Sequence, residues 1–489
     1  MSTFSLAFRG ARVLLVSQLL IGVGQFVYSG ATARVFTPTQ FGSFTGILGL
    51  QALLILVTTT GLPSLIMHRD VLTNRDLGWI RLYALVGGAL AAAAFYLATP
   101  LWADLLRALD EYQYRPLLTL SLLIFPIASV ESALLRREGR PTADALSILS
   151  AFVVPAVTAL IVAVTSRHPW ALALVPVLNP AVLGILSHLA RKQRYRAGAP
   201  TSHREFLAFS WNVSRQNVVF FVMGQAPAWA LSSTVGARSL GAFNRANSLA
   251  ASLSTPLTTA LNRATQAHWR RLIGDPRGAV VAMRDATLVS SSVAFPLFAM
   301  LIALAPQLTS VWLGAGWGQV GALVPGLAVA AALQVPFSLL AASLEMRGFF
   351  RKVRLGQVGL ALGAALTIIT LLVTRDPILT SVGVAVTQGI GLLALMTTVA
   401  GSSVRDFFTL LLRAAVPAGW AILIGGGAFL GAQAVHFLPV NLVISPEVAA
   451  CLSGGTAGGL TWLVTLRWQP IAALLARRNV RLPRFMRRH

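Results

Sequence analysis

The chain alternates between long apolar stretches and short polar or basic segments. Four of the apolar stretches are residues 82–98, 147–164, 355–373 and 382–400. A helix that crosses a bilayer needs about 20 mostly apolar residues, because the hydrocarbon core is about 30 Å thick. These stretches do not show the alternation of barrel strands. The pattern therefore predicts transmembrane α-helices.

Reading every apolar run between charged or Pro/Gly breaks predicts about fourteen spans. The expected fold class is all-α, a polytopic membrane protein. A basic N-terminal segment leads into a run too long for a cleavable signal, so the first span should stay in the membrane. The expected starting points are Arg9, Gln40, Leu77, Pro116, Pro141, Trp170, Glu205, Arg238, Arg284, Gln319, Arg351, Ile378, Arg405 and Glu447.

The composition agrees with this interpretation. Of the 489 residues, 56% are hydrophobic and 11% are charged, whereas a soluble domain carries about 25% charged residues. Lys and Arg total 39 against 15 acidic residues, a net charge of +24. Such a charge can indicate nucleic-acid binding, but no basic face alternates with stacking aromatic residues. We expect no nucleic-acid partner and assign the basic residues to loops beside anionic lipid headgroups.

The basic residues also orient the chain. With the N-terminus in the cytoplasm, about thirty of them fall in cytoplasmic segments and about six outside, which is the expected bias. An even number of spans places the C-terminus in the cytoplasm too. The outside residues are Arg34, Arg107, Arg115, Arg167, Arg238 and Arg375.

Two pairs of motifs suggest an internal repeat. Residues 36–44 and 235–243 both end in an apolar residue, Gly, a small residue and Phe, and residues 132–137 and 342–347 both precede a basic loop. The repeat distance of about 200 residues, or six spans, gives both halves the same orientation. We predict an N-terminal six-helix bundle at 1–198, a pseudo-symmetric one at 199–402, and two extra helices with a basic tail at 403–489. Bundles that rock about a common axis allow alternating access, which favours a transporter.

Part of the second half resembles a known family. Residues 240–249, Leu-Gly-Ala-Phe-Asn-Arg-Ala-Asn-Ser-Leu, are similar to a signature of the polysaccharide transport family. That family belongs to the multidrug/oligosaccharidyl-lipid/polysaccharide exporter superfamily. Further agreement lies at Phe41-Gly42, Ala133–Arg136, Pro256, Trp269–Arg271, Phe295–Leu297 and Val311–Trp317.

The resemblance implies a flippase of the bacterial inner membrane. Its substrate would be a polyprenyl-pyrophosphate-linked oligosaccharide for O-antigen or exopolysaccharide assembly, and a polysaccharide polymerase would act downstream. Two alternatives stay open: an exporter of drugs or other small molecules with the same fold, and a membrane enzyme acting on lipid-linked sugars. The short outer loops leave little room for a catalytic domain, and the sequence has no nucleotide-binding loop, carboxylate pair or nucleophile triad. We therefore expect no enzymatic activity, no cofactor and no metal.

Polar residues within the predicted spans are the candidate substrate-binding groups. Charged groups in the bilayer are costly and usually face a cavity or a partner. Arginine can bind a phosphate through two hydrogen bonds, and amides can bind sugar hydroxyls. The alternative is that the arginines extend to the interface and the glutamines join helices. The candidates are Arg215, Arg245, Arg263, Asn212, Asn217, Asn244, Gln18 and Gln25.

Two carboxylates near the predicted cytoplasmic ends are candidates for ion coupling. They are Glu131 and Glu345. The alternative is that they pair with Arg136 and Arg347, their basic neighbours. The first span has neither Asp nor Glu, which weakens the interpretation as a cation-coupled drug exporter.

Overall fold

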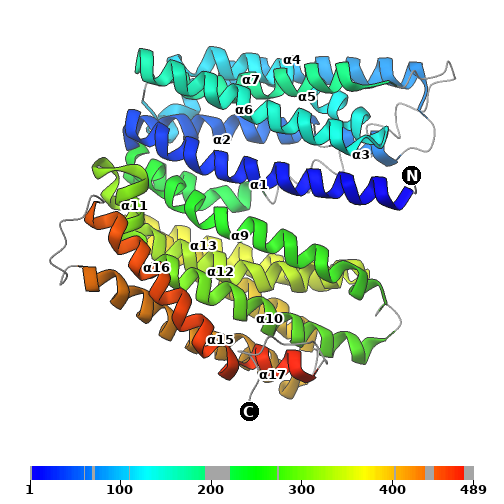
Figure 1. Cartoon of the computed structure of the whole chain (residues 1–489). Coiled ribbons are helices and arrows are strands. Elements are labelled where there is room, and N and C mark those ends of the chain that lie inside the picture. Colours follow the sequence, from blue (N-terminus) through cyan, green and yellow to red (C-terminus); the bar gives the residue numbers. More distant parts are fainter. Residues whose placement is uncertain are drawn as a thin grey trace. The chain divides into compact units, whose positions relative to one another are not determined.

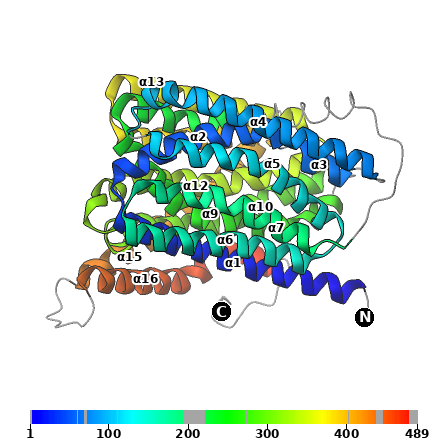
Figure 2. The same ribbon diagram turned by 90° about the horizontal axis from the view of Figure 1, so that it is seen from above.

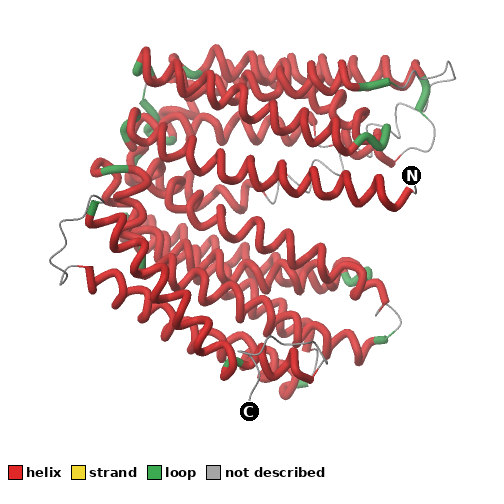
Figure 3. Tube along the Cα trace, in the orientation of Figure 1, coloured by secondary structure: helices red, strands yellow, loops and turns green. Residues whose placement is uncertain are grey.

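A computed structural model gives the fold. It describes residues 3–59, 61–68, 72–109, 111–192, 218, 221–271, 275–400, 403–435 and 445–477. Within these residues every regular element is a helix, and short turns connect most of them (Figure 3). The predicted all-α class is confirmed.

The chain divides into two compact units, Met1–Gly241 and Ala242–His489. Helices of the first unit (Figure 1) are α1 Thr3–Val35, α2 Pro38–Thr59, α3 Gly61–His68, α4 Asn74–Leu105, η1 Glu111–Gln113, α5 Arg115–Arg137, α6 Pro141–Ser166, η2 Pro169–Ala173 and α7 Leu174–Ala190. Residues 221–235 are also helical. Helix α9, Ala237–Arg271, begins in the first unit and continues in the second.

The second unit continues with α10 Pro276–Ala303, α11 Ala305–Leu313, η3 Ala315–Trp317, α12 Gly318–Met346, α13 Phe350–Thr374, α14 Pro377–Ala400, α15 Val404–Ala434, α16 Pro446–Thr465, η5 Leu466–Trp468 and α17 Pro470–Arg477. The two predicted extra helices, α15 and α16, pack along each other (Figure 2). Helix α15 also packs along α10. The predicted boundaries at 198/199 and 402/403 stay a prediction.

Among the described residues, 11 helices are long and apolar enough to cross a membrane. They coincide with eleven of the predicted spans. Helices α1 and α9, of 33 and 35 residues, are not among the eleven. The predicted seventh span lies largely outside the described residues. The total of fourteen and the orientation therefore stay predictions.

The helix ends support the predicted repeat. Helices α6 and α13 both end at an arginine in the left-handed conformation, Arg167 with φ 53° and Arg375 with φ 52°. In both places a proline follows two residues later and opens the next helix, since proline is favoured in a first turn. Packing also matches: α5 and α6 both contact α7, as α12 and α13 both contact α14.

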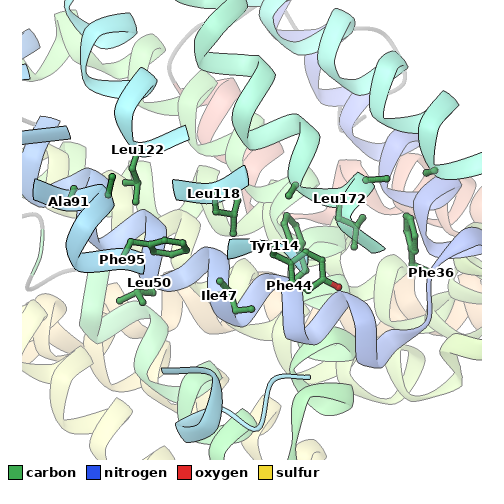
Figure 4. Close-up of a cluster of buried hydrophobic side chains, with 14 residues drawn as sticks. Phe36, Phe44, Ile47, Leu50, Ala91, Phe95, Tyr114, Leu118, Leu122 and Leu172 are labelled. Carbon is green, nitrogen blue, oxygen red and sulfur yellow. The ribbon is translucent and has the colours of Figure 1, made fainter. Parts of the chain in front are cut away.

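An apolar core fills the first unit. Phe95 of α4 and Leu118 of α5 are fully buried, with Ile47 of α2 and Tyr114 beside them (Figure 4). The side chain of Gln51 is buried in α2, and its amide donates to the carbonyl oxygen of Leu118 at 3.3 Å. Because an unpaired amide is costly in an apolar interior, this bond fixes α2 against α5.

Two glycines of the predicted repeat pack against each other. A Cβ at Gly42 in α2 would overlap the carbonyl oxygen of Ala237, and a Cβ at Gly241 in α9 would overlap that of Pro38. The arrangement is reciprocal, because each carbonyl belongs to the residue four positions before the other glycine. Glycine is required here because the two backbones touch, as in other close crossings of membrane helices.

Ion pairs join α10 and α15 in the second unit. Arg284 pairs with Asp406, and Arg413 pairs with Asp285. Helix α10 supplies the arginine of one pair and the aspartate of the other, so the direction of charge is reversed between the two pairs. They fix the position of α15 along α10.

Candidate functional site

A stripe of polar side chains runs along α9. Its members recur at intervals of three or four residues and so share one helical face. The distance from the first to the last, 18 residues, corresponds to about 27 Å. The four central residues are exposed and the two end residues are half-buried. We call these residues the α9 stripe: Asn244, Ser248, Ser252, Thr255, Thr259 and Asn262.

The hydroxyls of the α9 stripe keep capacity to accept hydrogen bonds. Ser248 donates to the carbonyl oxygen of Asn244, and Ser252 to that of Leu249, both at 2.7 Å. Each donation uses the only hydroxyl proton and leaves lone pairs on the oxygen. At the far end, Nδ2 of Asn262 donates to Oγ of Ser338 in α12 at 3.1 Å. Its Oδ1 is buried and has no partner within the described residues.

Arg245 is buried, with 4% of its surface exposed. Its Cζ lies 5.6 Å from the ring centroid of Trp317, which is itself buried. A guanidinium within about 6 Å of an aromatic face is attracted to it. In this conformation Arg245 therefore stabilises the contact between α9 and η3, and a ligand could reach its guanidinium only after a rearrangement.

Gln18 and Gln25 are exposed on α1. They flank Gly22, beside which a Cβ would meet nothing within 4 Å. A different face of α1 packs on α6, where a Cβ at Gly24 would press on the ring of Phe152. The two glutamines are thus displayed together and away from α6.

The remaining predicted arginines and asparagines are not placed. Arg215, Asn212 and Asn217 lie outside the described residues, and only the backbone of Arg263 is described, within α9. The predicted cationic path therefore stays a prediction. Asn244 is half-buried at the start of the α9 stripe.

Glu131 is buried and surrounded by basic groups of the first unit. Arg81 of α4 donates to its Oε1 from Nη2 at 2.7 Å and from Nε at 3.1 Å. Nδ1 of His188, on α7, lies 3.1 Å from its Oε2, and Nη2 of Arg191, which directly follows α7, lies 3.2 Å from the same oxygen. We call these four residues the Glu131 cluster. The carboxylate does pair with arginines, but they come from α4 and from the residue after α7, whereas Arg136 bonds the carbonyl oxygen of Ser132.

Glu345, the second ion-coupling candidate, is exposed near the end of α12. Within the described part of the chain it forms no ion pair. Arg347 lies close to the ring of Phe349, with 4.9 Å between Cζ and the ring centroid. Among the same residues there is no group of three or more His, Cys, Asp or Glu that could hold a metal ion.

Two features were missed by reasoning from the sequence. The α9 stripe had a readable signal, because serines and threonines recur there at helical intervals. The Glu131 cluster had none, since its partners lie 50, 57 and 60 residues from Glu131 along the chain. Only packing of α4 and α7 against α5 brings them together.

Solved membrane transporters share this fold. The lipid II flippase MurJ, in an inward closed conformation, superposes with a TM-score of 0.72 at 12% identity, over 96% of this chain and 99% of that one. A multidrug resistance MATE family transporter of the MOP superfamily, in an inward-facing conformation, gives a TM-score of 0.57 at 16% identity, over 83% and 99%. These likenesses show the fold alone.

The sequence has a relative that is named as a transport protein. It is 25% identical over 323 residues to the succinoglycan biosynthesis transport protein ExoT of Rhizobium meliloti (strain 1021). The match covers 64% of this chain and 64% of the relative. The chain thus spans slightly less than two thirds of that relative's length.

Residues 31–321 match a protein family described as "Polysaccharide biosynthesis protein". The predicted resemblance is confirmed, because the family match includes both glycine motifs and the whole α9 stripe. Eleven apolar helices make this a multi-pass membrane protein. The match covers more than half of the chain, which therefore belongs to the polysaccharide biosynthesis protein family.

Proposed function

We propose that the protein is a flippase of the bacterial inner membrane. It moves a polyprenyl-pyrophosphate-linked oligosaccharide from the inner to the outer leaflet for O-antigen or exopolysaccharide assembly. It works by alternating access and needs neither a cofactor nor a chemical step. The observation that carries the proposal is the α9 stripe, an exposed polar face on a helix of an otherwise apolar chain.

The length and chemistry of the α9 stripe suit a glycan. Its extent of about 27 Å is close to the hydrocarbon thickness of about 30 Å. Sugar hydroxyls would find partners over nearly the whole depth of the membrane. The described central residues are uncharged, so each contact is modest and a sugar can leave one position for the next. Lipid tails offer no hydrogen-bonding groups, so a polar face directed at them would gain no hydrogen bonds.

The glutamines of α1 extend the same chemistry to the first unit. Gln18 and Gln25 each offer an amide donor and acceptor to a sugar. Because they are exposed on a face that α6 does not cover, we propose that they too contact the glycan.

The pyrophosphate would be bound by arginines of the second half. Arg215 and Arg263 are the leading candidates, with Asn212 and Asn217 assisting Arg215. Arg245 joins them only in a conformation that separates its guanidinium from Trp317. By the repeat, the counterparts of Arg215, Arg245 and Arg263 are uncharged. The proposal is therefore asymmetric, with the phosphates nearer the second half and the lipid tail in the bilayer.

Of the two ion-coupling candidates, Glu345 fits the role better. It is exposed, whereas both carboxylate oxygens of Glu131 already accept hydrogen bonds or ion pairs. Coupling to an ion through Glu345, or mass action from a downstream polymerase, could supply the driving force.

The test removes the hydroxyls without changing side-chain size. Thr255→Val with Thr259→Val should lower transport of the lipid-linked oligosaccharide in a leaflet-specific assay at matched expression. Thr397→Val is the control, because Thr397 is an exposed span residue of α14 outside the α9 stripe. Unchanged transport in the α9 double variant would remove the stripe from the mechanism.

A deletion strain separates the two transporter classes. Loss of surface polysaccharide with unchanged sensitivity to cationic dyes is the expected result. Normal surface polysaccharide with new dye sensitivity would instead favour export of drugs, the activity for which the multidrug resistance MATE transporter is named. Chemical change of the lipid-linked sugar by the purified protein would favour an enzyme.

A further inference from the structure

The Glu131 cluster carries more positive than negative charge. One buried carboxylate faces the guanidinium groups of Arg81 and Arg191 and the imidazole of His188. Arg140 of the α5–α6 turn adds a third guanidinium, because its Nη1 donates to the carbonyl oxygen of Ala190, next to Arg191. A buried charge needs a partner to offset the loss of water. A second carboxylate lies beside these groups, because Oε2 of Glu138 accepts a hydrogen bond from the backbone N–H of Lys192, next to Arg191. Two carboxylates are still too few for three arginines.

The side chain of Arg191 indicates where an anion would bind. Its side chain is only 12% exposed, and it uses Nη2 on Glu131. Its Nε and Nη1 are buried and have no hydrogen-bond partner within the described residues. Buried N–H groups of a charged side chain are expensive to leave unbonded. An oxyanion placed against Arg191 would satisfy them.

The surroundings indicate an anion that is attached to a lipid. On α7, Leu189 is 72% exposed and Ile185 is 59% exposed, within two turns of Arg191. On α4, Leu82 is 45% exposed and follows Arg81 directly. Exposed apolar residues beside a cluster of arginines are typical of the boundary between hydrocarbon and headgroups. There, basic groups between helices bind phosphate-bearing headgroups.

We propose that the Glu131 cluster is a binding site for the phosphate of an anionic phospholipid. Arg191 supplies the open N–H donors, Arg81 and Arg140 supply further positive charge, and Glu131 competes with the phosphate for Arg81 and Arg191. The acyl chains lie along the exposed apolar residues of α7 and α4. The site is separate from the α9 stripe and does not depend on what the protein transports.

Binding of short-chain phosphatidylglycerol to the full chain in detergent, measured by native mass spectrometry, tests this site. Phosphatidylcholine, which carries a phosphate but no net charge, is the reference lipid. Arg191→Gln should weaken phosphatidylglycerol binding about tenfold, since charge-assisted hydrogen bonds are lost. Arg354→Gln, an exposed arginine of α13, removes the same charge elsewhere and should leave the affinity unchanged.

Glu131→Gln should change phosphatidylglycerol affinity in the direction opposite to Arg191→Gln. This difference distinguishes an effect on lipid binding from an effect on folding. The substitution removes the carboxylate that pairs with Arg81 and Arg191 in competition with the lipid phosphate, so phosphatidylglycerol should bind more tightly. A purely structural ion pair predicts otherwise: both variants would lower the thermal unfolding temperature, and neither would change lipid affinity relative to Arg354→Gln. That result would overturn the proposal.

A second outcome would also overturn it. If a polyprenyl phosphate displaced phosphatidylglycerol at equal concentration, and Arg191→Gln abolished that displacement, the site would belong to the transported class of lipid. Equal binding of phosphatidylglycerol and phosphatidylcholine to the unaltered protein would exclude a site for anionic lipid altogether.

Discussion

The reciprocal contact of Gly42 and Gly241 makes a sharp prediction about stability. Replacing either glycine by alanine adds one methyl group at a point where two backbones touch. In each case that methyl group would overlap a carbonyl oxygen, Ala237 for position 42 and Pro38 for position 241. Backbone cannot rotate away as a side chain can, so α2 and the start of α9 must separate.

The expected cost is that of overpacking, about 1–3 kcal/mol for each single variant. Once α2 and α9 have moved apart to admit the methyl group of one alanine, the methyl group of the second alanine also has space. The double variant Gly42→Ala/Gly241→Ala should therefore cost less than the sum of the singles, by roughly 0.5–3 kcal/mol, as for residues in direct contact. This coupling distinguishes a helix crossing from two unrelated steric defects.

Thermal or denaturant unfolding in one detergent gives the stabilities. Gly426→Ala is the matched control, because Gly426 lies within α15 and a Cβ there would meet nothing within 4 Å. Alanine is the better helix former by about 1 kcal/mol, so the control should be neutral or slightly stabilising. Single variants as stable as Gly426→Ala, or strictly additive losses, would refute the crossing.

Two further predictions concern the second unit and the orientation. Arg413→Gln and Asp285→Asn should each destabilise the protein by more than the joint replacement of both residues, because either single change removes the ion-pair partner of a partly buried charge. A double-mutant cycle of unfolding free energies measures this, and additive losses would count against the ion pair. For the orientation, Arg167 and Arg375 are each replaced by cysteine in a chain whose Cys451 is replaced by serine. Both cysteines should react with an impermeant thiol reagent that is added outside intact, right-side-out inner-membrane vesicles. If both were protected from the reagent, the predicted orientation would be reversed.

Most of the helices could be predicted because bilayer thickness fixes their length. Most of the predicted starting points fall within a few residues of the helix starts that the structure describes, as at Pro141, where α6 begins. The start predicted at Arg284 was wrong by more, since α10 begins at Pro276. Helix α9 was the hardest to interpret, since its polar stripe lowers its hydropathy although it runs unbroken for 35 residues. The glycine motifs were found as a repeat, but their mutual contact depends on tertiary packing that spacing alone does not contain.

Side-chain environments could be predicted less well, and for physical reasons. Arg245 was expected to face a ligand, yet a tryptophan 72 positions later covers its guanidinium. Glu131 was given two interpretations, and its partners were found on α4 and α7 because long-range packing selects them. Position along a helix predicts which residues share a face, whereas the neighbour of that face depends on the rest of the fold.

The central claim is that the α9 stripe conducts a lipid-linked oligosaccharide across the membrane. The most direct measurement uses purified protein in liposomes that contain a fluorescent polyprenyl-pyrophosphate oligosaccharide, with leaflet location reported by an impermeant quencher. We expect protein-dependent movement of the lipid between leaflets, with the lipid chemically unchanged. The rate should fall markedly in the Thr255→Val/Thr259→Val variant but not in Thr397→Val. Equal rates in all three proteins, or a rate no higher than in protein-free liposomes, would contradict it.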